Sequence, residues 1–132
     1  MKRIAAVAVL AACMSVSLVA VATAHTVKRD STVIFQIKKN GPADDTYEGK
    51  VLSDSNRCVA GRQVVIYQRV AGPDVVVDDA ITDANGDYSS TAGDIPAGTY
   101  YAVVTRKFLR NDAEHTHVCK RAVSSDGVIV DA

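Results

Sequence analysis

The sequence predicts an all-β fold: an antiparallel Greek-key β-sandwich of about seven or eight short strands. Three observations lead to this prediction. Outside the first 24 residues the chain holds 16 valines and six isoleucines but only two leucines, and this bias toward β-branched residues favours strands. Short apolar runs recur along the chain, separated by Gly, Pro, Asn and Asp. No run keeps the 3.6-residue apolar period of an amphipathic helix.

The first 24 of the 132 residues have the order of an export signal. Residues 1–3 are Met-Lys-Arg, and the following residues carry no charge up to an Ala-Thr-Ala ending. This order predicts a secretory signal peptide that is cleaved between Ala24 and His25. Two alternatives stay open: an uncleaved membrane anchor, and lipidation at Cys13, which ends a Leu-Ala-Ala-Cys sequence similar to a lipoprotein cleavage box.

The remaining residues, 25–132, are predicted to form one domain outside the cytoplasm, secreted, periplasmic or in the cell envelope. They carry 13 basic and 15 acidic side chains, so the formal net charge is 13 − 15 = −2. This near-neutral balance argues against a nucleic-acid-binding protein. The mature chain contains no further apolar stretch of the length that a membrane span requires.

Cys58 and Cys119 are the two cysteines of the mature chain. Because disulfides persist in an exported protein, we expect these two residues to be bonded to each other. The alternative is a pair of buried, unbonded thiols. A bridge across this part of the sequence would close a loop that contains most of the domain.

The N-terminal half of the domain contains four predicted strands. Residues Thr32–Lys38 place Val33, Phe35 and Ile37 on one face, which is the alternation expected of a half-buried strand. A polar loop with Asn-Gly-Pro and two aspartates follows. The next three strands are predicted at 47–53, 62–70 and 74–82.

The C-terminal half contains four more predicted strands. Residues 83–86 are Asp-Ala-Asn-Gly and are predicted to close a hairpin onto 87–91, because Asn-Gly tolerates the positive φ angles of tight turns. The strand at 99–107 alternates Tyr100, Ala102 and Val104 with residues of the opposite face. A polar loop is predicted at 110–114. The last two strands are predicted at 115–123 and 127–130.

Two clusters in this region resemble a known family. Residues 82–88 (TDANGDY) and 95–101 (IPAGTYY) are similar to the T-D-x-x-G-x-Y … L-x-x-G-x-Y pattern of carboxypeptidase regulatory-like and collagen-adhesin B-type domains. Residues 47–51 and 61–67 resemble the opening strands of that family. The resemblance implies a prealbumin-like β-sandwich for about half of the mature chain. It gives turn and core roles to Asp83, Asn85, Gly86, Tyr88, Gly98 and Tyr100, and it implies no activity, because such domains serve as stalks, binding modules or appendages.

Histidine provides the sharpest hypothesis about chemistry. Cleavage after Ala24 would leave His25 at the N-terminus with both a free amine and an imidazole. His115 and His117 lie two residues apart, on one side of a predicted strand. An N-terminal histidine with a further histidine is the ligand set of a copper histidine brace, and nitrogen ligands suit Cu(II). The alternative interpretation is that these are polar residues at a strand start, with His117 packed near the disulfide.

Other candidate sites in the sequence are weaker. Asp83, Asn85 and Asp87 form part of a calcium-loop pattern, but the twelfth position is Asp94 instead of Glu, and a turn accounts for them, so calcium is not expected. No catalytic motif is recognisable, so no enzyme is expected. The basic side chains at residues 106, 107, 110, 120 and 121 are interpreted as a solvated surface.

Two functions follow from these observations. The first is an exported, non-catalytic binding or structural module of the bacterial envelope or exterior, with its ligand, its partner and its oligomeric state left open. The second is a secreted copper-binding protein that uses His25 with His115 or His117. No other cofactor is expected.

Overall fold

The structure is a computed structural model that describes residues 24–130, and these residues contain eleven β-strands and one 3-10 helix. The predicted all-β class is therefore confirmed. The proposed signal sequence up to Thr23, including Cys13, lies outside the described residues. Within the described part of the chain, no helix has the length and apolar character needed to cross a membrane.

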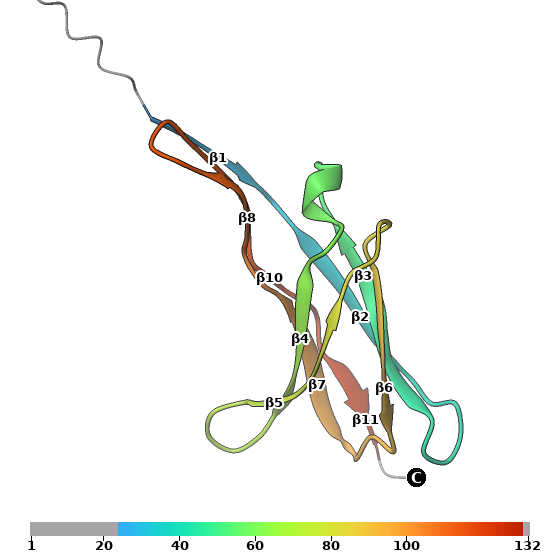
Figure 1. Ribbon diagram of the computed structural model, residues 1–132. Coiled ribbons are helices and arrows are strands. Elements are labelled where there is room, and N and C mark those ends of the chain that lie inside the picture. Colours follow the sequence, from blue (N-terminus) through green and yellow to red (C-terminus); the bar gives the residue numbers. More distant parts are fainter. Residues whose placement is uncertain (1–23, 131–132) are drawn as a thin grey trace, which may run out of the picture.

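Two sheets pack face to face and form a sandwich (Figure 1). The first sheet has the strand order β2-β3-β6 and the second has the order β10-β7-β4-β5, with β11 also paired to β7. All pairings in these two sheets are antiparallel. The bounds are β2 Thr32–Lys38, β3 Asp45–Leu52 and β6 Asp87–Gly93 in the first sheet, and β4 Gln63–Arg69, β5 Val75–Ile81, β7 Gly98–Val104, β10 Ala122–Val123 and β11 Gly127–Ile129 in the second.

The hydrophobic core lies between the two sheets and takes alternate residues of β2, β3, β4 and β7, whereas β5 contributes no buried residue. Val33 and Phe35 of β2 are buried, as are Tyr100, Ala102 and Val104 of β7. The alternation read from the sequence is confirmed in both strands. Burial of these side chains on one face fixes the register of each strand, because a slip of one residue would turn them to solvent.

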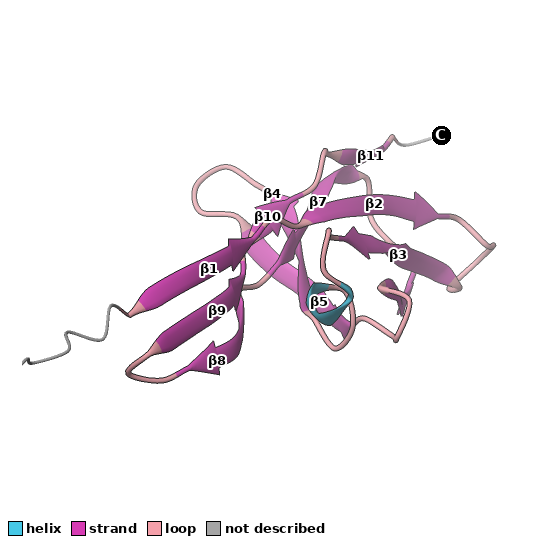
Figure 2. Cartoon of the chain, turned by 90° about the horizontal axis from the view of Figure 1, so that it is seen from above, coloured by secondary structure: helices cyan, strands magenta, loops and turns pink. Residues whose placement is uncertain are grey.

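A third sheet projects from the sandwich, as Figure 2 shows. It consists of β1 (His25–Arg29), β9 (His115–Cys119) and β8 (Lys107–Asn111), in the order β1-β9-β8. We call these three strands the finger. β9 pairs with β1 in parallel and with β8 in the antiparallel sense.

The predictions for this region are partly wrong. Strand β1 was not expected, and the single strand predicted at 99–107 is divided into β7 and the start of β8. The chain leaves the sandwich at Thr105 and Arg106, and β8 then covers residues 110 and 111 of the segment predicted to be a loop, 110–114. Residues 112–114 form the loop between β8 and β9. The predicted strand at 115–123 is likewise divided at residues 120–121, where β9 of the finger gives way to β10 of the sandwich.

The predicted hairpin around residues 83–86 is also wrong, although the tight turn exists. Asp83 Oδ1 accepts hydrogen bonds from the backbone N–H groups of Asn85 (2.8 Å) and Asp87 (3.0 Å), and Gly86 has a φ of 84° that favours glycine. The strands on either side do not pair with each other, because β5 pairs with β4 and β6 pairs with β3. The turn carries the chain from one sheet to the other.

A buried carboxylate fixes the loop between β2 and β3. The side chain of Asp45 is fully buried, and its Oδ2 accepts hydrogen bonds from Lys39 Nζ (2.5 Å) and from the backbone N–H of Ile95 (3.0 Å). The hydrogen bond from Lys39 is the main reason that the pKa of Asp45 lies below its ordinary value. The charged form of Asp45 therefore stabilises the folded state.

This carboxylate predicts a sensitivity to acid. Because the pKa of Asp45 is lower in the folded state than in the unfolded chain, its stabilising effect is complete above the unfolded pKa and is lost as the pH falls through the folded pKa. We expect the melting temperature of the wild type to decrease as the pH is lowered from about 5 to about 3. We expect Asp45→Asn to lower the melting temperature at neutral pH and to make it depend less on pH. Asp44→Asn, an exposed change in the same loop, is the control and is expected to keep the wild-type slope.

Candidate functional site

The finger joins the sandwich at three chain crossings, and one buried arginine binds all three. Arg62 is 1% exposed, and its guanidinium donates hydrogen bonds to Ser31 Oγ (3.0 Å) and to the carbonyl oxygens of Thr105 (2.8 Å) and Lys120 (2.9 Å). These acceptors lie after β1, after β7 and after β9 respectively. A further hydrogen bond reaches the carbonyl oxygen of Cys58 at 2.6 Å. Burial lowers the pKa of Arg62, but the group remains charged at neutral pH.

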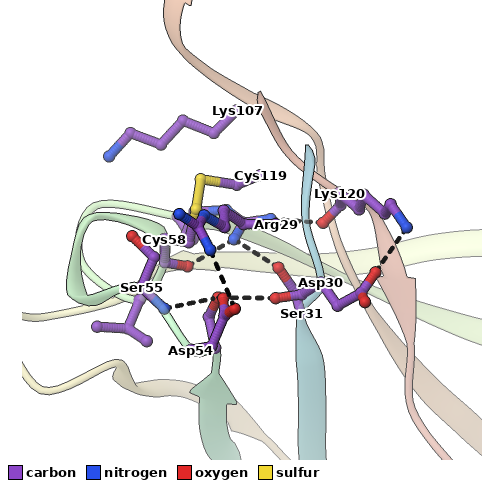
Figure 3. Close-up of a disulfide and its surroundings, with 12 residues drawn as sticks. Arg29, Asp30, Ser31, Asp54, Ser55, Cys58, Lys107, Cys119 and Lys120 are labelled. Carbon is purple, nitrogen blue, oxygen red and sulfur yellow. Dashed lines mark hydrogen bonds and ion pairs between the residues drawn. A yellow bond between two sulfur atoms is a disulfide. The ribbon is translucent and has the colours of Figure 1, made fainter. Parts of the chain in front are cut away.

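The Cys58 that Arg62 contacts forms a disulfide. Figure 3 shows this disulfide and its surroundings. The bond joins Cys58, at the end of the 3-10 helix Asn56–Cys58, to Cys119, the last residue of β9, with a Cα–Cα distance of 5.4 Å. The predicted pairing is confirmed. Both cysteines are fully buried. The disulfide therefore anchors the base of the finger to the sandwich.

One face of the finger carries all three histidines of residues 25–132. The parallel register places His25 opposite His115, and His117 follows on the same face of β9. The ring centroids are 4.4 Å apart for His25 and His115, 5.9 Å for His25 and His117, and 6.2 Å for His115 and His117. The structure thus brings together the three histidines that were selected from the sequence, although His25 and His115 are 115 − 25 = 90 positions apart along the chain.

Carboxylates lie next to these rings. His115 Nδ1 is 3.9 Å from Asp112 Oδ1 and 4.0 Å from Glu114 Oε2, and it is buried with no hydrogen-bond partner among the described residues. Burial is the main reason that the pKa of His115 is lowered, which favours its neutral ring. A hydrogen bond from Arg110 lowers the pKa of Asp112 to about 2. Within residues 24–130, no three His, Cys, Asp or Glu side chains already form a ready-made metal site.

The opposite face of the finger forms a basic groove of about 400 Å³. Phe108 of β8 is 52% exposed within it. Lys120 pairs with Asp30 at 2.6 Å, whereas Lys28, Arg106 and Arg121 form no ion pair or side-chain hydrogen bond with the rest of residues 24–130. The groove is lined by Thr26, Lys28, Arg106, Phe108, Thr116, Val118, Lys120 and Arg121.

Two members of the basic surface expected from the sequence do not belong to this groove. Lys107 Nζ donates a hydrogen bond to the carbonyl oxygen of Ala60 (2.9 Å), and Arg110 Nε pairs with Asp112 Oδ2 (2.5 Å). Lys28 takes their place, because the unpredicted strand β1 carries it to the base of the finger. Arg106 and Arg121 do lie together in the groove, as the sequence suggested.

A larger depression, with a volume of about 620 Å³, lies elsewhere, over the sheet β2-β3-β6. Its charged side chains already bind one another: Lys50 Nζ lies 3.0 Å from Asp87 Oδ1, and Gln36 donates a hydrogen bond to Glu48 at 2.7 Å. A charged ligand would have to break these pairs. The finger, which has unpaired cations on one face and clustered imidazoles on the other, is therefore the candidate functional site.

The residues of the family-like motifs support the sandwich, away from the finger. Tyr88 and Tyr100 are buried, and their hydroxyl groups donate to the carbonyl oxygens of Ile34 (2.7 Å) and Pro96 (2.8 Å). Gly98 is the first residue of β7. No family model, curated protein or solved structure matches this chain.

Sequence reasoning did not find Arg62, Lys28 or Phe108 as members of a site. Arg62 binds main-chain oxygens of distant segments, which leave no pattern in the sequence. Lys28 belongs to β1, whose register pairs it with Val118, 118 − 28 = 90 residues later along the chain. Phe108 belongs to β8 and pairs with the same Val118, only 118 − 108 = 10 residues away, but it joins the groove only once β1 has been placed beside β9. A possible signal was the cluster of cations around residue 106 and the apolar Phe-Leu pair that follows it.

Proposed function

We propose that this chain is an exported, non-catalytic β-sandwich module of the bacterial envelope or exterior, and that the finger is its binding part. The turn motifs and buried tyrosines support kinship with carboxypeptidase regulatory-like and collagen-adhesin B-type domains. The disulfide supports an oxidising compartment, because such bonds rarely persist in the cytosol. The sandwich would serve as a scaffold that carries the finger.

The basic groove is the observation that carries this proposal. Among residues 24–130, Lys28, Arg106 and Arg121 have no partner for their charges, and they surround a half-exposed Phe108. An exposed aromatic ring bordered by unpaired cations is suited to a surface that presents anionic groups. Anionic polymers of the cell envelope provide this chemistry. Binding of this kind weakens as salt rises, because the cations are exposed and screened.

Retention in the cell envelope tests the proposal. The full chain is expressed in a bacterial host, the cells are fractionated, and the mass of the mature protein is measured, with a start at His25 expected. We expect Lys28→Glu with Arg121→Glu to move the protein from the envelope to the soluble fraction. Lys38→Glu with Arg57→Glu reverses two exposed cations outside the finger and is expected to leave retention unchanged. The proposal is contradicted if both double variants lose envelope retention to the same extent, or if the wild-type chain stays in the cytoplasm.

A further inference from the structure

We propose that the histidine face of the finger binds a transition-metal ion, Cu(II) in preference to others, through the imidazoles of His25, His115 and His117. This inference deepens the proposed function and rests on it, because it names one ligand for the finger of an exported module. The groove and the histidines occupy opposite faces of the finger: the histidines lie on β1 and β9, and the groove also includes Phe108 of β8. The two binding activities are therefore separable by mutation.

The spacing of the rings agrees with one shared ion. A metal–nitrogen bond of about 2.0–2.1 Å places an ion about 3.2 Å from the centroid of the imidazole that binds it. Two imidazoles on the same ion therefore have centroids at most about 6.4 Å apart, and about 4.5 Å apart when they bind at a right angle. The observed separation of 4.4 Å is close to the right-angle value, and the separations of 5.9 and 6.2 Å lie below the upper limit.

The backbone supplies the positioning, and rotation of the side chains completes the site. In the described residues the ring nitrogens do not yet converge on one point. His25 is exposed, and His115 and His117 are partly exposed, so their rings can turn to other staggered rotamers without repacking the core. His115 Nδ1 has no hydrogen-bond partner within the described part of the chain that a bound ion would have to replace. An ion that draws the three rings together would also hold β1 against β9.

The charges around the rings favour a cation. Asp112 and Glu114 place two carboxylates within about 4 Å of His115 Nδ1. Arg110 is the nearby cation, and its guanidinium is already paired with Asp112. The site therefore gains negative charge from Glu114 that offsets the charge of a bound metal ion.

The donor set selects the metal. Ca²⁺ and Mg²⁺ bind oxygen ligands, whereas imidazole nitrogens suit Cu(II), Ni(II) and Zn(II), with Cu(II) the tightest in the general order of affinities. The backbone nitrogen of His25 lies at the same end of the finger, 3.1 Å from the carbonyl oxygen of Glu114. In a chain that begins at His25, this nitrogen is an amine and adds a fourth nitrogen donor beside the three imidazoles.

Copper titration of the purified, disulfide-bonded chain 25–132 tests the inference. Cu(II) is added in competition with a chelator of known affinity, and the bound ion is followed by electron paramagnetic resonance. We expect one Cu(II) per chain and slower amide exchange in β1 on binding. Loss of a hydrogen-bond partner of a metal ligand alone weakens metal binding about 10- to 100-fold. Removal of two ligands, in His115→Gln with His117→Gln, is therefore expected to weaken Cu(II) binding by at least about 100-fold. Thr26→Ala with Thr116→Ala alters the opposite face and is the matched control.

The outcomes separate this inference from the proposed function. Copper binding that survives the double histidine change, or wild-type binding weaker than about 10 μM, overturns the metal site. A chain with one glycine added before His25 keeps the three imidazoles and is expected to retain copper binding. If that chain binds no copper, the ion depends on the N-terminal amine and not on the three imidazoles, which also overturns the inference. The groove variant Lys28→Glu with Arg121→Glu is expected to bind copper normally, whatever its retention in the envelope. Amide exchange of the sandwich strands verifies that each variant is folded.

Discussion

Replacing Cys58 and Cys119 together by alanine is expected to lower the free energy of unfolding by about 4 kcal/mol. The disulfide spans 61 residues, and the entropy of the unfolded chain that it restricts grows with the length of the closed loop. Both sulfur atoms are buried in the structure, so alanine leaves a small cavity in addition. Urea unfolding of the wild type and of the double variant, monitored by circular dichroism, measures the difference.

The disulfide also predicts a local effect, which global unfolding does not report. Cys119 ends β9, so its removal frees the base of the finger from the 3-10 helix. We expect amide exchange in β8 and β9 to accelerate more than exchange in the core strands β4 and β7. Reduction of the wild-type protein is the control and is expected to reproduce the stability of the double variant. A reduced protein as stable as the oxidised one would show that the disulfide has no stabilising role.

Much of the sandwich was predictable from the sequence because most of its core strands have one buried face. In β2 and β7 that face places Val33 and Phe35, or Tyr100, Ala102 and Val104, at every second position, although Val103 of β7 is buried as well. Such a pattern can be read locally, whatever strand lies next to it. The turn at residues 83–86 was readable for the same reason, since Asp83 and Gly86 act within the turn itself. The pairing of the strands could not be read locally in this way, and the prediction of a hairpin at this turn was wrong for that reason.

The finger was only partly predictable because it stands away from the core. Strand β1 contains His25, Thr26, Lys28 and Arg29 with one valine between them, and four of its five residues are exposed. A strand with both faces open to water has no apolar period to detect. In addition, β1 pairs in parallel with β9, and the paired residues His25 and His115 are 115 − 25 = 90 positions apart in the sequence. The histidines were found in spite of this, because residue type and the expected cleavage site identified them without any knowledge of the strand.

The position of the finger relative to the sandwich depends on Arg62, and this dependence leads to the second large effect. We expect Arg62→Met to lower the free energy of unfolding by about 3–5 kcal/mol. Methionine fills much of the same volume, but it donates no hydrogen bonds. The carbonyl oxygens of Cys58, Thr105 and Lys120, of which the first is buried and the other two are partly buried, would lose a charged donor together. Each buried acceptor that loses its partner costs about 1–3 kcal/mol.

Three further variants distinguish the hydrogen-bonding role of Arg62 from its charge and its volume. Arg62→Lys keeps the positive charge but has a single nitrogen in place of the planar fork, so we expect an intermediate loss of stability. Arg57→Met makes the same change at an exposed arginine in the 3-10 helix and is expected to alter stability by less than about 0.5 kcal/mol. If Arg62→Met costs no more than Arg57→Met, the assignment of Arg62 as the anchor of the finger is wrong. In Cys58→Ala/Cys119→Ala protein we expect Arg62→Met to cost more than in the wild type, because the arginine and the disulfide hold the same junction and each partly compensates for loss of the other.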